Sequence, residues 1–159
     1  MSDAQKTAVV TGASQGIGAG IVKGFVERGF NVVANSRKVT QSIEVAASNH
    51  VALVDGHIGE PATAAKIVET ALSRFKSIDV LVNNAGIFFT KPFTDYTAED
   101  FKSLVSTNVE GFLYITQLSI KQMLAQKTGG EHRHDHGGPC SQPDPGRHGR
   151  GPDGHQRWS

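Results

Sequence analysis

Short apolar runs alternate with longer segments of helical periodicity over the first 130 residues. The apolar runs predict buried strands at 7–10, 31–34, 51–54 and 78–82. The periodic segments predict helices at 17–28, 40–48, 61–75 and from Thr97 to about residue 123. Four such strand–helix units predict an α/β fold, in which helices cover both faces of a parallel sheet.

Local signals at the helix ends support these boundaries. Gly29 follows the first helix as a C-cap, and Pro61 suits the first turn of the third helix. Glu99 and Asp100 lie in the first turn of the last helix, where negative charge interacts favourably with the helix dipole.

The hydrophobic pattern stops at Gly129. The last 29 residues, 131–159, contain two apolar residues, Cys140 and Trp158, but five of the seven histidines and four of the six prolines. Such a segment has too little apolar surface to offset the entropy lost on ordering. We therefore predict a folded domain over residues 1–128 and a disordered tail over residues 129–159.

Composition narrows the classes of function. Sixteen Lys and Arg against 15 Asp and Glu give a net charge of +1, which offers no electrostatic basis for binding nucleic acid or an anionic membrane. No apolar run reaches the roughly 18 residues of a membrane span, and the first residues lack the features of a signal peptide. We therefore expect a cytoplasmic protein.

The tail histidines raise the question of a metal site. His132, His134 and His136 alternate along the chain, as the histidines of a metal-binding tag do. A specific zinc site needs ligands at fixed spacing on a structured frame, and the tail offers no such frame. We expect no specific metal site, and the single cysteine, Cys140, excludes an internal disulfide.

A glycine-rich turn, Thr11-Gly-Ala-Ser-Gln-Gly-Ile-Gly18, joins the first strand to the first helix. Its three glycines allow the backbone to turn tightly and to approach a pyrophosphate without Cβ clashes. The N-terminus of the following helix offers unpaired N–H groups to an anion. A tight turn without a ligand is the alternative, but the position between strand and helix favours a phosphate cradle.

Two further motifs extend this interpretation. Asn83-Asn-Ala-Gly86 follows the fourth strand, and Asn108 lies within Ser106-Thr-Asn-Val109 on the last helix. With the G-x-x-x-G-x-G turn, these motifs make residues 7–127 resemble the short-chain dehydrogenase/reductase family. The resemblance implies a partial Rossmann-like sheet in strand order 3-2-1-4, with the nucleotide at the carboxyl ends of the first and fourth strands.

The resemblance also implies roles for individual residues. The dinucleotide phosphates would be held by Gly12, Ser14, Gln15, Gly16, Ile17 and Gly18. The adenosine ribose and the nicotinamide side would lie against Asn84, Ala85 and Gly86. Asn108 would support a proton-relay water in the active site.

The end of the second strand predicts the cofactor. A carboxylate there would bind the ribose 2′-hydroxyl of NAD, but the sequence has Asn35-Ser-Arg-Lys38. Arg37 is suited to a 2′-phosphate and Ser36 to donating a hydrogen bond to it, so we predict NADP rather than NAD. The alternative is that the two basic residues are solvated loop charges. His57 stands where the family has an adenine-contacting Asp, and we interpret it as a surface histidine.

The family's catalytic residues have no counterpart in the 159 residues. The family transfers hydride between a nicotinamide dinucleotide and a carbonyl or alcohol, using a Tyr followed four residues later by a Lys. Tyr96 and Tyr114 are the only tyrosines, and Asp100 and Leu118 stand four residues after them. We therefore expect a dinucleotide-binding half without turnover.

The composition of the tail is typical of GC-rich codons translated out of frame. If the first base of Glu131 is dropped, permitted codons yield a segment that begins with Ser-Ile-Val and ends with Thr-Lys-Gly-Gly. These stretches resemble the family's fifth strand and the surroundings of its lysine, so we expect a frameshift. Two alternatives stay open: a non-catalytic NADP-binding module and an unstable truncated product. Pairing of two copies through the last helix also stays open.

Overall fold

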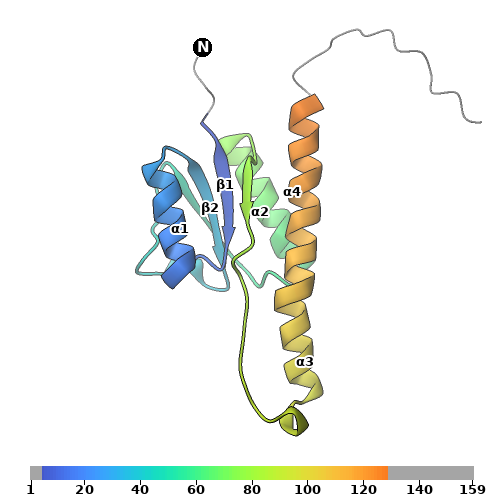
Figure 1. The fold of residues 1–159 in the computed structure, drawn as a ribbon. Helices are drawn as coiled ribbons and strands as arrows, with labels where there is room; N and C mark the ends of the chain where they lie inside the picture. Colours follow the sequence, from blue (N-terminus) through green and yellow to red (C-terminus); the bar gives the residue numbers. More distant parts are fainter. Residues whose placement is uncertain (1–4, 129–159) are drawn as a thin grey trace, which may run out of the picture.

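Four parallel strands form the centre of the computed structural model, which describes residues 5–128 (Figure 1). In chain order the elements are β1 (Thr7–Thr11), α1 (Gly16–Glu27), β2 (Asn31–Ser36), η1 (Val39–Gln41), β3 (Val51–Asp55), α2 (Pro61–Phe75), β4 (Val80–Val82), η2 (Phe93–Asp95), α3 (Ala98–Val105), η3 (Ser106–Glu110) and α4 (Gly111–Thr128). The sheet order β3-β2-β1-β4 confirms the predicted partial Rossmann-like sheet. The predicted tail, with its histidines and Cys140, lies outside the described residues.

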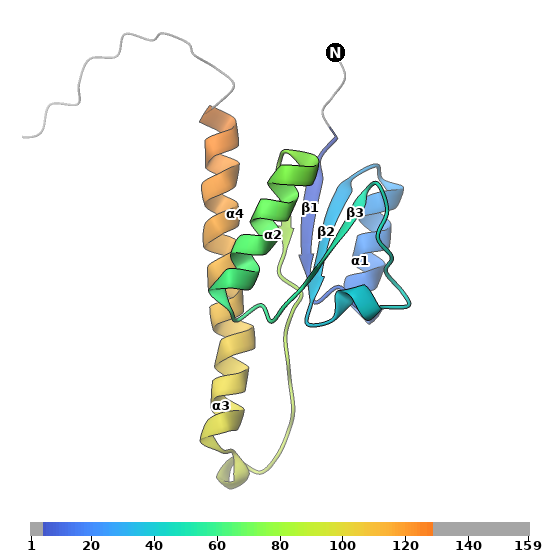
Figure 2. The ribbon, with the colours of Figure 1, turned by 180° about the vertical axis from the view of Figure 1, so that it is seen from behind.

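The helices cover both faces of the sheet, as the alternating pattern predicts. Helix α1 lies on one face, and α2 and α4 lie on the other (Figures 1 and 2). Successive strand residues point to opposite faces, so each strand contributes to two cores. Val10 packs in the cluster that contains Val22 of α1, whereas Val9 packs with Ile67 of α2 and Ile115 of α4.

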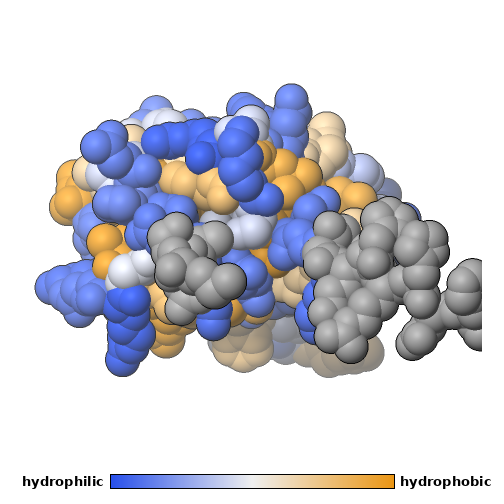
Figure 3. Space-filling model, turned by 90° about the horizontal axis from the view of Figure 1, so that it is seen from above, coloured by the Kyte–Doolittle hydropathy of each residue, from blue (hydrophilic) through white to orange (hydrophobic). Residues whose placement is uncertain are grey.

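The start of β1 and the end of α4 lie at the same end of the molecule (Figure 1). Seen from that end, the surface shows mostly hydrophilic side chains with smaller apolar patches between them (Figure 3). On α4, the apolar residues Phe112, Leu113 and Ile120 are exposed. No helix within residues 5–128 is long and apolar enough to cross a membrane.

The predicted helix over residues 40–48 is wrong. The structure has only the short η1 there, followed by irregular chain. The Ser42 hydroxyl accepts hydrogen bonds from the amides of Glu44 and Val45, each at 3.1 Å. Such side-chain bonds to nearby amides replace the bonds that a helix would make, because they satisfy the same donors in a turn.

The predicted last helix contains a π-helical turn. The turn, η3, interrupts the regular spacing between α3 and α4. It lies where the helix crosses the loop after β3. A Cβ placed on Gly111 would lie 2.6 Å from Cγ2 of Ile58, and one placed on Gly59 would lie 2.2 Å from Oγ of Ser106. The close contact requires glycine on both elements.

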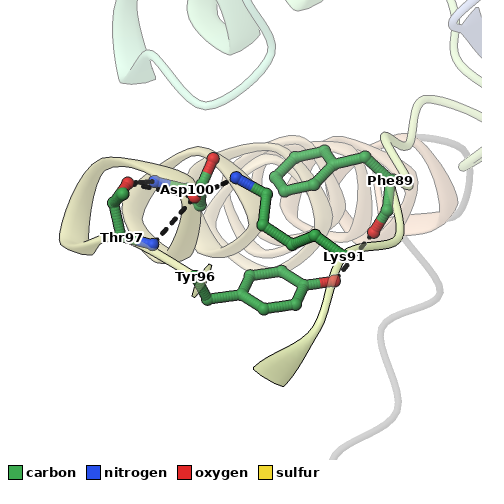
Figure 4. A network of polar contacts seen from close by, with 5 residues as sticks. All are labelled: Phe89, Lys91, Tyr96, Thr97 and Asp100. Atoms are coloured by element: carbon green, nitrogen blue, oxygen red, sulfur yellow. Dashed lines mark hydrogen bonds and ion pairs between the residues drawn. The ribbon is translucent and has the colours of Figure 1, made fainter. Parts of the chain in front are cut away.

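A polar network fastens the loop before α3 to the start of that helix (Figure 4). The amide of Asp100 donates to Thr97 Oγ1 at 3.1 Å, and the amide of Thr97 donates to Asp100 Oδ2 at 2.8 Å, which completes a capping box. Lys91 Nζ lies 2.6 Å from the same carboxylate oxygen. The Tyr96 hydroxyl donates to the carbonyl of Phe89 at 2.9 Å, which closes the loop on itself.

The glycine-rich turn is held against the end of β4. Thr11 Oγ1 accepts from the amides of Asn84 and Ala85 at 3.1 and 3.0 Å. The Asn84 side-chain amide donates to the carbonyls of Thr11 and Gly12 at 3.1 and 3.0 Å. A Cβ on Gly18 would lie 2.1 Å from the Gly12 carbonyl oxygen, so only glycine fits beneath the turn.

The packing at Gly18 predicts a large loss of stability for Gly18→Ala. The added methyl group has to displace backbone, and we expect a loss of about 1–3 kcal/mol or more in the free energy of unfolding. Gly20→Ala, on the same helix with nothing within 4 Å of its Cβ position, is the matched control. We expect it to stabilise the protein by roughly 0.5–1 kcal/mol. Urea unfolding followed by circular dichroism measures both, and equal stability of the two variants would contradict the packing argument.

The network at Asp100 predicts a specific pH dependence. The Lys91 ammonium, followed by the Thr97 amide, lowers the pKa of Asp100 to about 2. A carboxyl group whose pKa is lowered by folding stabilises the fold above its unfolded pKa and loses that contribution as pH falls through its folded pKa. We expect Asp100→Asn to lower the midpoint of thermal unfolding near neutral pH. The difference from wild type should shrink as pH approaches about 2. A difference that is independent of pH would refute the role of the charge.

Candidate functional site

A groove of about 520 Å³ opens at the carboxyl ends of the strands. From β1 the chain continues to α1 on one face of the sheet, and from β4 it continues to the helices on the other face (Figure 1). The groove therefore lies at the switch point of an open α/β sheet. Its lining comes from five segments and comprises Gly12, Ser14, Gln15, Asn35, Ser36, Arg37, Gly56, His57, Ile58, Ala85, Gly86, Ile87, Lys102, Ser103, Ser106 and Thr107. The groove therefore joins the predicted phosphate turn, the end of β2 and the segment after β4.

The predicted phosphate residues occupy different positions around the turn. Gly12, Ser14 and Gln15 line the groove. Gly16 begins α1 with a φ of 57°, and nothing lies within 4 Å of its Cβ position. Gly18 is buried beneath the turn. The side chain of Ile17 is 79% exposed and is not part of the groove lining.

The end of β2 places a cation beside the groove. Ser36 is half-buried and Arg37 is exposed, and both line the groove. Within residues 5–128 the Arg37 guanidinium has no hydrogen bond or ion pair. Asn35 is 1% exposed, and its Oδ1 is buried without a hydrogen-bond partner among the described residues. An unpaired guanidinium at the edge of a groove is suited to an anion.

The charges of the lining have one sign. Among the described residues the lining includes the cations Arg37 and Lys102 and no carboxylate. This composition fits a ligand that carries phosphate groups. Sequence analysis did not identify Lys102, because a single lysine on an exposed helical turn has no distinguishing signal.

His57 is half-buried, and both of its ring nitrogens make hydrogen bonds. The amide of Gly59 donates to Nδ1 at 3.1 Å, and Nε2 lies 3.2 Å from Oγ1 of Thr107. Because Nδ1 accepts, the neutral ring carries its proton on Nε2 and donates it to the threonine hydroxyl. His57 thus ties the loop after β3 to η3.

Asn108 holds the segment after β4. Its side-chain oxygen accepts from the amide of Ile87 at 2.9 Å, and its side-chain nitrogen donates to the carbonyl of Ile87 at 3.0 Å. A Cβ on Gly86 would lie 3.3 Å from Asn108 Oδ1, so the two segments are in close contact. Asn108 lies in the π-helical turn η3, and such turns are frequent at functional sites.

The residues of the Asn83–Gly86 motif have different positions and contacts. Ala85 and Gly86 line the groove. Asn84 is not part of the lining, because its amide group points to the backbone of the glycine-rich turn. Asn83 donates to Oγ1 of Thr116 at 3.0 Å on α4. Both asparagines therefore position the backbone that lines the groove.

Comparisons with known proteins agree with this geometry. A sequence model of the family described as short chain dehydrogenase matches residues 6–130. An uncharacterized oxidoreductase of Staphylococcus saprophyticus is 34% identical over an alignment of 130 residues, and the match covers 78% of this chain and 56% of that protein. An uncharacterized oxidoreductase of Methylorubrum extorquens is 35% identical over an alignment of 125 residues, and the match covers 74% of this chain and 50% of that protein.

Solved structures give the same result. A 3-ketoacyl-(acyl-carrier-protein) reductase from Brucella melitensis, crystallised with NADH, is 32% identical with a TM-score of 0.72. The similarity covers 79% of this chain and 53% of that one. The chain thus spans about half the length of the relatives it matches. The family match over most of the chain and the geometry of the groove lead to one conclusion: the chain belongs to the short-chain dehydrogenase/reductase family.

Proposed function

We propose that residues 1–128 form the dinucleotide-binding half of a cytoplasmic short-chain reductase and bind NADP(H) in the groove. The observation that carries this proposal is the groove lining, which combines a glycine-rich turn with cations and contains no carboxylate among the described residues. The NADH in the Brucella melitensis relative supports a nicotinamide dinucleotide as the ligand.

The residues at each end of the groove suit different parts of the dinucleotide. The turn from Gly12 to Gly18 and the N-terminus of α1 would hold the pyrophosphate, through amide N–H groups and the Ser14 hydroxyl. Ser36 and Arg37 would hold the 2′-phosphate. The end of β2 offers no carboxylate to a ribose 2′-hydroxyl, which favours NADP over NAD.

The bound dinucleotide would supply or accept a hydride in exchange with a carbonyl or alcohol. In this chain, Ala85, Gly86 and Ile87 would form the groove wall beyond the phosphates, and Asn108 would keep that wall in place. No tyrosine in the 159 residues is followed four positions later by a lysine. We therefore assign cofactor binding to this chain and hydride transfer to a protein that also carries the Tyr-x-x-x-Lys residues.

Cofactor preference is tested by Arg37→Ala. A hydrogen-bonded charge pair contributes about 1.5–3 kcal/mol, so we expect NADPH binding to weaken by roughly 10- to 150-fold. NADH binding should change by less than about twofold, because NADH has no 2′-phosphate. Lys38→Ala, a neighbouring exposed lysine outside the groove lining, is the control. Calorimetric titration measures all three proteins, and tighter binding of NADH than of NADPH by wild type would refute the proposed preference.

The absence of turnover is tested with the purified 159-residue chain. We expect no oxidation of NADPH above the protein-free rate with a panel of ketones and aldehydes, under conditions in which titration shows the cofactor to be bound. Bound cofactor without turnover would support the division into binding and catalytic parts. Steady reduction of any carbonyl compound by the pure chain would overturn it.

A further inference from the structure

We propose that Glu44 is an affinity-determining residue of the groove, because its carboxylate occupies an amide at the start of α1 and opposes the cofactor's pyrophosphate. This inference rests on the proposed function, since it concerns the same site. It adds a residue that no sequence motif identifies and that lies outside the groove lining.

The contact is a hydrogen bond between two distant parts of the chain. The amide of Gly16, the first residue of α1, donates to Oε2 of Glu44 at 3.2 Å. The first amides of a helix have no partner within the helix, and the helix dipole favours a negative charge beside them. The same free amides and the same dipole would also favour binding of the pyrophosphate. An internal carboxylate thus occupies a donor in the cradle assigned to the cofactor.

The backbone around Glu44 is fixed against the turn. The Ser42 hydroxyl donates to the carbonyl of Ser14 at 2.6 Å and accepts from the amides of Glu44 and Val45. Val45 is 5% exposed and packs in the cluster that contains residues of α1. The backbone of Glu44 is therefore held beside the cradle, within reach of the Gly16 amide for the exposed carboxylate.

No cation among the described residues neutralises this carboxylate. The ion pairs within residues 5–128 join Lys23 to Glu27 and Lys91 to Asp100, and neither includes Glu44. The charge of Glu44 therefore acts on any anion that enters the cradle, and the pyrophosphate carries charge of the same sign. The cofactor therefore either displaces the carboxylate from the Gly16 amide or binds in spite of the repulsion between the carboxylate and its pyrophosphate.

Substitution can separate the charge from the shape. In Glu44→Gln the side-chain oxygen still accepts from the Gly16 amide, so the hydrogen bond can remain while the repulsion is lost. Glu44→Lys replaces repulsion with attraction. Glu27→Gln is the matched control, because Glu27 is an exposed carboxylate at the other end of the same helix, with Oε1 3.9 Å from Lys23 Nζ.

The experiment is a titration of the full 159-residue chain and its variants with NADPH and with NADH at low salt. We expect Glu44→Gln to bind both cofactors about three- to tenfold more tightly than wild type, and Glu44→Lys to bind them more tightly still. Glu27→Gln should match wild type. The gain should shrink near 1 M salt, where the screening length falls to about 3 Å.

The two cofactors identify the group that Glu44 opposes. NADPH and NADH share the pyrophosphate, so equal gains for both support the proposal, and a gain confined to NADPH overturns it. Unchanged or weaker binding by folded Glu44→Gln, beside measurable binding by wild type, overturns this inference alone. Absence of binding by wild type and by all variants overturns both this inference and the proposed function. Binding by Glu44→Gln without binding by wild type supports the inference.

Discussion

The hydrogen bonds between Asn84 and the glycine-rich turn join the carboxyl ends of β1 and β4, and the groove depends on this junction. The side-chain amide of Asn84 donates hydrogen bonds to the carbonyls of Thr11 and Gly12, and the Thr11 hydroxyl accepts hydrogen bonds from the backbone amides of Asn84 and Ala85. Thr11 is 1% exposed, so breaking these bonds would leave buried polar groups unpaired. The junction fixes the backbone of the glycine-rich turn and of the segment after β4. The space that remains beneath the turn is too small for any residue but glycine at position 18.

From this junction a chain of contacts extends to the last helix. The backbone continues through Ala85 and Gly86 to Ile87, which pairs with the side chain of Asn108. His57 connects the same helical turn, through Thr107, to the loop after β3. The loops after β3 and β4 are therefore held against one π-helical turn, and the glycine-rich turn is bonded to the second of these loops. The groove is a property of this set of contacts and not of any single motif.

The loop after β2 carries charged side chains in and beside the groove. The Thr40 amide donates to Asp55 at 2.9 Å, and hydrogen bonds from Thr40 lower the pKa of the Asp55 carboxyl. Ser42 holds the same loop against the turn. A loop anchored at these two points carries Arg37 on one side and Glu44 on the other. In our proposals the first attracts the cofactor and the second opposes it, so one loop sets both preference and affinity.

The sequence by itself determined the α/β class, the order of the strands and the position of the glycine-rich turn. The class and the position of the turn follow from local signals, namely apolar runs, helical spacing and glycines, whereas the strand order follows from the family resemblance over residues 7–127. Only the tertiary structure decided that residues 40–48 form no helix and that Asn84 points to the turn. It also paired Asn108 with Ile87, 21 residues away, and Glu44 with Gly16, 28 residues away. The physical reason is that packing brings polar groups from distant parts of the chain together. The local sequence around each group does not indicate which partner it will meet.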